Sequence, residues 1–93
     1  MNLHFEWDDD KANSNLKKHG VSFEEALSVF DDELSLTITD ELHSFSEYRF
    51  VDVGISSKRR ILVVVYTERG SVVRIIGARK ANKREIKDYE ENR

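Results

Sequence analysis

Four arginines accompany the β-branched stretches in the later part of the chain, at Arg49, Arg60, Arg74 and Arg79. A guanidinium group stays charged at any working pH, and its planar fork of donors matches two phosphate oxygens. Side chains on neighbouring antiparallel strands align in rows, so these arginines converge on one surface if the strand registers agree. Such a cluster would bind phosphate groups and stabilise the extra negative charge of a phosphate in transition.

A different interpretation of these arginines stays open. Arg74 and Arg79 are an odd number of positions apart, so in a regular strand they face opposite sides unless Gly77 introduces a bulge or the strand has ended. Strand arginines also form ion pairs with acidic neighbours without any further function. The acidic candidates are Asp52, Glu68 and Glu47.

Three side chains are candidates for a proton carrier. His43 lies in the segment "DELHSFSE" among acidic residues, and its chemistry suits a general acid or base best. Lys80 and Tyr66 are the alternatives, because Tyr66 ends an apolar strand and could reach an uncovered sheet face. One histidine among loop carboxylates is a weak metal signal, so we expect no metal and no cofactor.

Several classes of protein are disfavoured by residues that the chain lacks. The sequence contains no cysteine, so disulfides and thiolate metal sites are impossible. No serine lies in a nucleophile elbow, and no glycine-rich loop precedes a helix, which argues against hydrolases of those types. The longest apolar stretch, "ILVVVY", is far too short to span a bilayer, and the first residues do not resemble a secretory signal. We therefore expect a cytoplasmic protein with no membrane association.

Charge is divided unequally along the chain, although the formal net charge is only −3. Residues 1–57 contain 4 Lys/Arg against 13 Asp/Glu, and residues 58–93 contain 11 against 5. Such asymmetry indicates either that the basic part meets a polyanion or that the two parts pair with each other.

The elements that must position the arginines can be predicted from capping signals and periodicity. Helices are predicted over 7–20 and 21–30, the second opened by a capping box of Ser22 and Glu25. Strands are predicted over 34–39, 48–55, 60–67 and 72–79, and a poorly apolar helix follows from Lys80. Short connections between the last three strands require antiparallel neighbours. The expected fold is a single α+β domain, residues 1–93, with two N-terminal helices, a four-stranded antiparallel sheet and a C-terminal helix.

Two segments give the chain a resemblance to a known family. The blocks "NLKKHGVSFEEA" and "RIIGARKANKRE", with "E.RFVDVG" between them, resemble the BrnT family of small bacterial toxins from Phe5 to about Glu91. The resemblance implies a RelE-like fold and an RNA-cleaving activity that arrests growth. It places functional arginines at Arg60, Arg74 and Arg79, with Arg49 as a fourth. Two departures stand out, since Asp32 replaces a frequent proline and "SSKRR" replaces a turn that often contains glycine. The second departure leaves Arg59 and Arg60 as alternatives for the matching arginine, and we choose Arg60 because it immediately precedes the apolar strand.

RNA cleavage without metal would make use of this residue set. The ribose 2′-hydroxyl attacks its own phosphate, so the protein supplies phosphate binding, charge stabilisation and a modest proton carrier. We therefore expect a metal-independent endoribonuclease. Its catalytic residues are expected to be Arg60, Arg74, Arg79 and His43, and its RNA-binding residues Arg49, Lys80 and Tyr66.

The resemblance also implies a protein partner. A ribbon-helix-helix antitoxin of the BrnA type would neutralise the toxin in a complex with two copies of each chain, and would bind operator DNA. Two alternatives from other classes remain: a non-enzymatic module that binds RNA or protein through the same basic face, and a degenerate toxin that retains only antitoxin binding.

Overall fold

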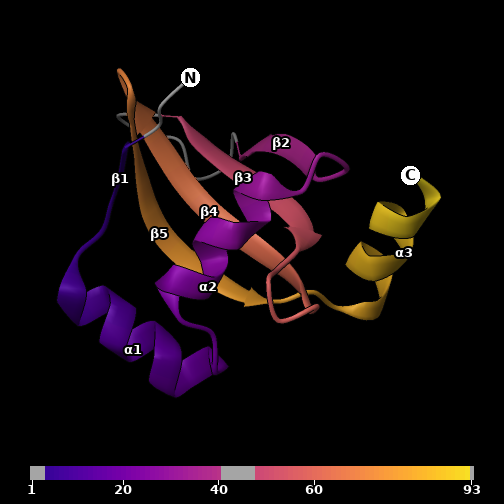
Figure 1. Ribbon diagram of the computed structural model, residues 1–93, viewed down its shortest axis with the longest axis horizontal. Helices are drawn as coiled ribbons and strands as arrows, with labels where there is room; N and C mark the ends of the chain where they lie inside the picture. The colour runs from indigo at the N-terminus through magenta and orange to yellow at the C-terminus, as the bar shows by residue number, and fades with distance from the viewer. Residues whose placement is uncertain (1–3, 41–47, 93) are drawn as a thin grey trace.

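Five strands form one mixed sheet in the order β1-β5-β4-β3-β2. The computed structural model describes residues 4–40 and 48–92. Its elements are, in chain order, β1 (His4–Glu6), α1 (Asp9–His19), α2 (Phe23–Leu27), the 3₁₀ helix η1 (Ser28–Asp31), β2 (Leu36–Asp40), β3 (Arg49–Ile55), β4 (Ile61–Arg69), β5 (Val72–Lys80) and α3 (Lys83–Glu91). Helix α2 lies over one face of the sheet, α1 lies beside β5 at the edge of that face, and α3 lies to the other side (Figure 1).

The prediction of a four-stranded, wholly antiparallel sheet was wrong because of β1. This strand pairs in parallel with β5, with Phe5 opposite Val73, while all other strand pairs are antiparallel. Three residues are too few to show an alternating pattern, and the partner strand lies almost 70 positions away. Phe5 fixes the strand by packing on Phe30, with ring centroids 5.2 Å apart.

The predicted helices form, with shorter bounds than expected. Asp8 caps α1 by accepting a hydrogen bond from the amide of Lys11, and Gly20 ends the helix at φ 69°. The Ser22 hydroxyl accepts a bond from the amide of Glu25, as a capping box requires. The Glu25 carboxylate does not complete the box, because it contacts Arg60 and Ser56 instead.

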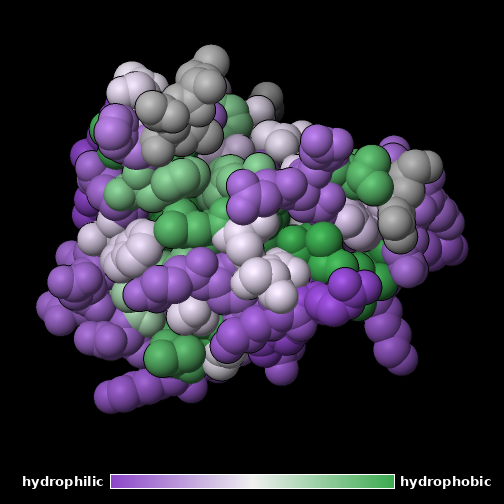
Figure 2. All heavy atoms as spheres, viewed as in Figure 1, coloured by the Kyte–Doolittle hydropathy of each residue, from purple (hydrophilic) through white to green (hydrophobic). Residues whose placement is uncertain are grey.

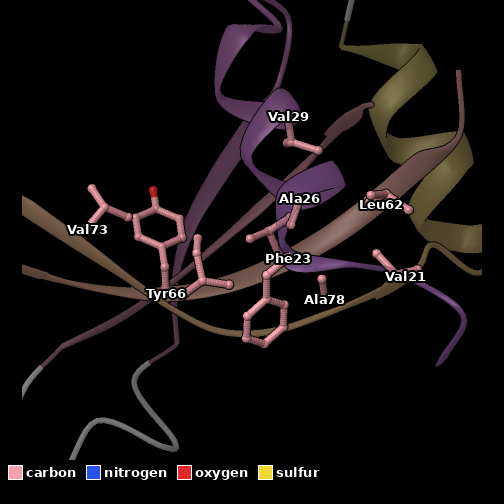
Figure 3. Packing of buried hydrophobic residues seen from close by; sticks show 10 residues of the cluster. Val21, Phe23, Ala26, Val29, Leu62, Tyr66, Val73 and Ala78 are labelled. Atoms are coloured by element: carbon pink, nitrogen blue, oxygen red, sulfur yellow. The ribbon is translucent and has the colours of Figure 1, made fainter. Parts of the chain in front are cut away.

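The core lies between the two N-terminal helices and the sheet (Figure 3). Its members share full or nearly full burial and come from the α1–α2 connection, α2, η1 and the strands β4 and β5: Val21, Phe23, Ala26, Val29, Leu62, Val64, Tyr66, Val73, Ile75 and Ala78. On β4 the side chains at 62, 64 and 66 face the helices, so those at 63, 65 and 67 face the other way. Seen from the helix side, hydrophilic residues dominate around α1 and α3, with hydrophobic patches between them (Figure 2).

An irregularity in β5 decides which face its later residues occupy. Val65 pairs with Gly77 and Tyr66 pairs with Ile75, so Ile76 has no partner on β4. One extra residue reverses the alternation of side chains beyond it. Arg74 and Arg79 therefore share a face although they are an odd number of positions apart. The bulge that the sequence allowed is present, and its extra residue is Ile76, one position before Gly77.

Within the described ranges, no helix is long and apolar enough to cross a membrane.

Candidate phosphate-binding face

The sheet face turned away from α1 and α2 carries three of the predicted arginines. Arg49 on β3 and Arg74 on β5 lie directly opposite Thr67 on β4, one on each side. Arg79 pairs with Val63 on the same face. Directly opposite side chains on one face have Cβ atoms about 5 Å apart. We call this surface, defined by Arg49, Arg74 and Arg79, the arginine face.

Glu6 extends the row of Arg49, Thr67 and Arg74 onto the edge strand. It is the register partner of Arg74, and the Arg74 Nη1 atom donates a hydrogen bond to its Oε2 atom. The side chains of Arg74 and Glu6 remain 30% and 43% exposed. The pair is therefore open to an incoming ligand.

Thr67 lies at the middle of this row and is fully buried. Its hydroxyl oxygen has no hydrogen-bond partner in the part of the chain that the structure describes. A buried, unsatisfied hydroxyl costs about 1–3 kcal/mol. The row is thus built on a residue that is unfavourable for stability.

Arg79 lies farther along the same face and is held by α3. It is four positions from Thr67 in strand register, or about 13 Å along the sheet. Its Nη1 and Nη2 atoms each donate to a Glu85 carboxylate oxygen at 2.8 Å. These bonds lower the pKa of Glu85 and raise that of Arg79, against the opposing effect of burial. Glu85 also accepts a bond from the amide of Asn82 in the capping box of α3.

Arg60 does not join the other arginines, so the expected convergence of all four was wrong. Its Nε atom donates to Glu25 Oε2 at 3.0 Å, and its Nη2 atom donates to Glu25 Oε1 and to the Gly20 carbonyl. Glu25 is only 4% exposed, and the bonds from Arg60 lower its pKa although burial opposes this. Arg60 therefore ties β4 to α2 on the helix side of the sheet.

The expectation that Tyr66 reaches the uncovered face was also wrong. Its side chain is 5% exposed and points toward the helices, where its hydroxyl donates to Asp52 Oδ1 at 2.9 Å. Its ring stacks on Phe50 and meets Phe30 edge-on. Burial raises the pKa of the Tyr66 phenol far above its usual range, and the adjacent Asp52 carboxylate adds to this. The phenol is therefore not exposed on the arginine face.

The two remaining candidates differ in what can be said of them. Lys80 is exposed and pairs with Leu62, a residue of the helix-side core, so it lies on the other side of β5 from Arg79. His43 lies outside the described residues. In the described part of the chain, no three histidine, aspartate or glutamate side chains are grouped closely enough to hold a metal ion.

Glu6 and Thr67 are the members of this face that sequence reasoning missed. Glu6 belongs to β1, a strand that no sequence pattern predicted, and its partner Arg74 is distant in sequence. Thr67 is of a residue type that is common in strands, so its identity alone gives no signal of a functional position. Only the register of β3, β4 and β5 reveals its position between two arginines.

Comparison with known proteins identifies the family. The sequence profile described as "Ribonuclease toxin, BrnT, of type II toxin-antitoxin system" matches residues 7–85. The chain belongs to the BrnT family. Among solved structures, the fold is similar to that of the ribonuclease toxin BrnT of Brucella abortus, with a TM-score of 0.63 and 23% identity over 88% of this chain and 100% of that chain. No curated protein matches the chain.

Membership of the BrnT family gives the chain a place among ribonuclease toxins of type II toxin-antitoxin systems, with an antitoxin as partner. The matched region contains Arg49, Arg74, Arg79 and Glu85, but begins one residue after Glu6. The arginine face is therefore almost entirely inside the matched region.

The structure also explains the two departures from the usual BrnT pattern. In "SSKRR", Arg59 has φ 61°, a left-handed conformation that favours glycine. Arg59 thus occupies the glycine-like position, and Arg60 is the arginine that precedes β4. Asp32 ends η1, and its Oδ2 atom accepts bonds from the Ile55 amide at 2.9 Å and the Tyr89 hydroxyl at 2.6 Å. This aspartate joins η1, β3 and α3, which a proline could not do.

Proposed function

We propose that this BrnT-family chain is a metal-independent endoribonuclease whose arginine face binds and cleaves RNA. The observation that carries the proposal is the strand register, because the bulge at Ile76 brings Arg74 and Arg79 onto the face that also holds Arg49. Arginine forks that are partly exposed, as those of Arg74 and Arg79 are at 30% and 44%, suit the phosphates of a single RNA strand.

The chemistry follows from the positions of the two arginines beside Thr67. Attack of a ribose 2′-oxygen on the adjacent phosphate places additional negative charge on the phosphate oxygens. Arg49 and Arg74 would stabilise that charge from two sides, and such a preorganised donor is worth about 100- to 1,000-fold in kcat. Arg79, about 13 Å farther along the sheet, would hold a different phosphate of the same strand. Arg60 serves the fold in this scheme, and Tyr66 has no part in the reaction.

The test compares the wild type with an R74A/R79A variant, in bacteria and in solution. Induced at equal level, the wild type should arrest growth and shorten cellular RNA, and the variant should do neither. In solution the wild type should cleave ribose-containing RNA in the presence of EDTA and leave the same sequence with 2′-deoxyribose intact. A K17A/R84A variant, which loses two exposed cations of α1 and α3, is the matched control and should keep full activity.

Other outcomes would select another function. Salt-sensitive RNA binding without cleavage would indicate a non-enzymatic binding module. A tight antitoxin complex without growth arrest would indicate a degenerate toxin. Cleavage that EDTA abolishes would contradict the metal-independent mechanism.

The proposed partner is a BrnA-type ribbon-helix-helix antitoxin, in a complex with two copies of each chain that binds operator DNA through the antitoxin. Inhibition would follow from covering the arginine face. Light scattering of the purified complex would give its stoichiometry. Protection of RNA in proportion to added antitoxin would support direct covering of the site.

A further inference from the structure

Glu6 is the carboxylate that lies in the same cross-strand row as the two central arginines. Strands β1 and β5 run side by side (Figure 1), and Glu6 is directly opposite Arg74. We propose that Glu6 is the general base that takes the proton from the RNA 2′-hydroxyl. This assignment rests on the proposed ribonuclease function and supplies the proton carrier that the arginines themselves cannot provide, because guanidinium groups do not lose protons at working pH.

The contacts of Glu6 leave one of its carboxylate oxygens able to accept the 2′-hydroxyl proton. Arg74 contacts one carboxylate oxygen, Oε2, through one of its five N–H donors. The second oxygen, Oε1, accepts no hydrogen bond from any group of the described residues. Arg74 can therefore hold the carboxylate with one edge while its remaining donors bind a phosphate. A phosphate in that position places its neighbouring 2′-hydroxyl beside Oε1.

Glu85 provides an internal comparison, because it is also paired with an arginine of this face. Both of its oxygens are occupied, Oε2 by Arg79 and Oε1 by Arg79 and the Asn82 amide. These bonds lower the pKa of Glu85, and its side chain is only 25% exposed. Both Glu85 oxygens therefore bind groups that position Arg79 and α3. The Glu6 side chain is 43% exposed, and its Oε1 atom can contact a substrate.

The other described candidates fit the role less well. The Tyr66 hydroxyl is enclosed on the helix side, and Lys80 lies on the other side of β5 from Arg79. His4 is exposed and lies on the same side of β1 as Glu6, two residues and about 7 Å earlier. No arginine of the face contacts it within the described residues. Among the described candidates, Glu6 combines contact with a phosphate-binding arginine with a carboxylate oxygen that accepts no bond from the described residues.

The proposed step balances as follows. The Glu6 carboxylate takes the 2′-hydroxyl proton, and the 2′-oxygen forms a bond to phosphorus. The bond between phosphorus and the 5′-oxygen breaks, and that oxygen takes a proton from water. The products are a 2′,3′-cyclic phosphate end and a 5′-hydroxyl end, and Glu6 returns its proton to solvent. Arg49 and Arg74 bind the phosphate throughout.

The first experiment separates catalysis from binding in the full-length chain. Glu6→Gln keeps a hydrogen-bond acceptor for Arg74 but cannot take a proton, so kcat should fall at least about 100-fold. Its affinity for a 2′-deoxy analogue of the substrate should equal or exceed that of the wild type, because a negative charge beside the phosphate is gone. Arg74→Ala should weaken that binding as well as lowering kcat.

Two controls test whether a change in net charge or a disturbed fold explains the expected loss of kcat in the Glu6 variants. Glu68→Gln removes an exposed carboxylate from β4 on the helix side of the sheet, and it should cleave like the wild type. Glu6→Ala should regain part of its activity when formate is added, because a small carboxylate can occupy the vacated space. Rescue by formate requires a folded protein, so it would exclude misfolding as the cause of the loss.

The outcomes distinguish this inference from the proposed function. Wild-type cleavage by Glu6→Gln, or loss of kcat in His4→Ala instead, would overturn the assignment of Glu6 and leave the ribonuclease intact. Loss of kcat in Glu6→Ala without any rescue by formate would also overturn it. Absence of cleavage by the wild type itself would overturn the proposed function.

Discussion

At Arg59 the backbone adopts a conformation that its side chain does not favour. Its φ of 61° closes the turn between β3 and β4, where the Ser56 amide donates to the Arg60 carbonyl at 2.8 Å. A left-handed conformation costs a non-glycine residue about 1–2 kcal/mol, and glycine avoids this cost. Glycine in turn loses about 0.5–1 kcal/mol more backbone conformational entropy on folding, so the net gain in stability is smaller.

Arg59→Gly should therefore raise the free energy of unfolding by about 0.5–1 kcal/mol. The measurement is a urea unfolding curve at neutral pH. Lys58→Gly is the matched control, since Lys58 lies in the same turn without a positive φ and gains nothing from glycine. Equal effects of the two substitutions would show that strain at Arg59 is not the cause.

Thr67 carries the second unfavourable feature at this scale, the buried hydroxyl without a partner in the described residues. Thr67→Val keeps the shape and removes the hydroxyl, so the free energy of unfolding should rise by about 1 kcal/mol. Thr67→Ser keeps the hydroxyl and removes the methyl group, so it should be destabilised. Thermal unfolding of both variants provides the comparison, and a less stable valine variant would show that the hydroxyl is satisfied in solution.

At the scale of elements, Asn15 joins α1 to the sheet with polar contacts. Its side-chain nitrogen donates to the carbonyls of Val21 and Ala78 at 2.9 and 2.8 Å, and its oxygen accepts a bond from the Ala78 amide. Helix α1 has no buried residue, so this amide takes the place of a hydrophobic anchor. It also satisfies backbone groups on the part of β5 that lies beyond β1.

Asn15→Ala should lower the free energy of unfolding by about 2–3 kcal/mol, because three hydrogen bonds are lost and the Ala78 backbone groups lose their partner. For a chain of this length that corresponds to a decrease in Tm of roughly 10–20 °C. Asn13→Ala, an exposed site on the same helix, should change Tm little. A small effect at Asn15 would mean that water replaces the amide.

The Glu25–Arg60 pair joins α2 to β4 and makes stability depend on pH. Bonds from Arg60 hold the pKa of Glu25 below its ordinary value of 4.5, in spite of burial. A carboxylate with a lowered folded-state pKa stabilises the fold above its unfolded pKa, and this contribution is lost as the pH falls through the folded pKa.

Glu25→Gln should therefore be less stable than the wild type at neutral pH, and the gap should narrow as the pH falls below about 4.5. Urea midpoints measured for both proteins across the acid range give this difference directly. Other groups, including Glu85, titrate in both proteins and cancel. A gap that stays constant with pH would show that Glu25 does not carry this dependence.

The sequence predicted the elements well where a local signal exists. The apolar run of β4, the caps of α1 and the Ser22 cap of α2 all lie within a few residues of what they determine. Strand β1 has no such signal, because its pairing with β5 depends on a partner far along the chain. The same applies to the site. The sequence named Arg49, Arg74 and Arg79, but it could not determine whether the strand continues past a bulge or which face Arg60 joins.

For the whole molecule, the unequal division of charge is partly balanced by the fold. Among the ion pairs of the described residues, Glu25–Arg60 and Glu6–Arg74 each join an acid of the first part to an arginine of the second. The expectation that the two parts pair with each other is therefore met in part, whereas the expectation of a polyanionic partner stays a prediction. Pairing between the two parts occurs, and it still leaves Arg74 and Arg79 partly exposed on one face.

Binding of RNA to an acidic protein through such a local surface should be strongly salt dependent. Each phosphate contact on a single strand contributes a slope of about −0.7 in a plot of log affinity against log salt concentration, so three arginines give a slope of about −2. Arg79→Ala should reduce the magnitude of the slope by about 0.7. Lys17→Ala, at an exposed site on α1, should leave the slope unchanged. The measurement is binding of a fluorescent 2′-deoxy strand over a series of salt concentrations. Equal salt-dependence slopes for wild type and Arg79→Ala would show that Arg79 does not contact RNA. The RNA-binding site would then be limited to the row of Arg49, Thr67 and Arg74.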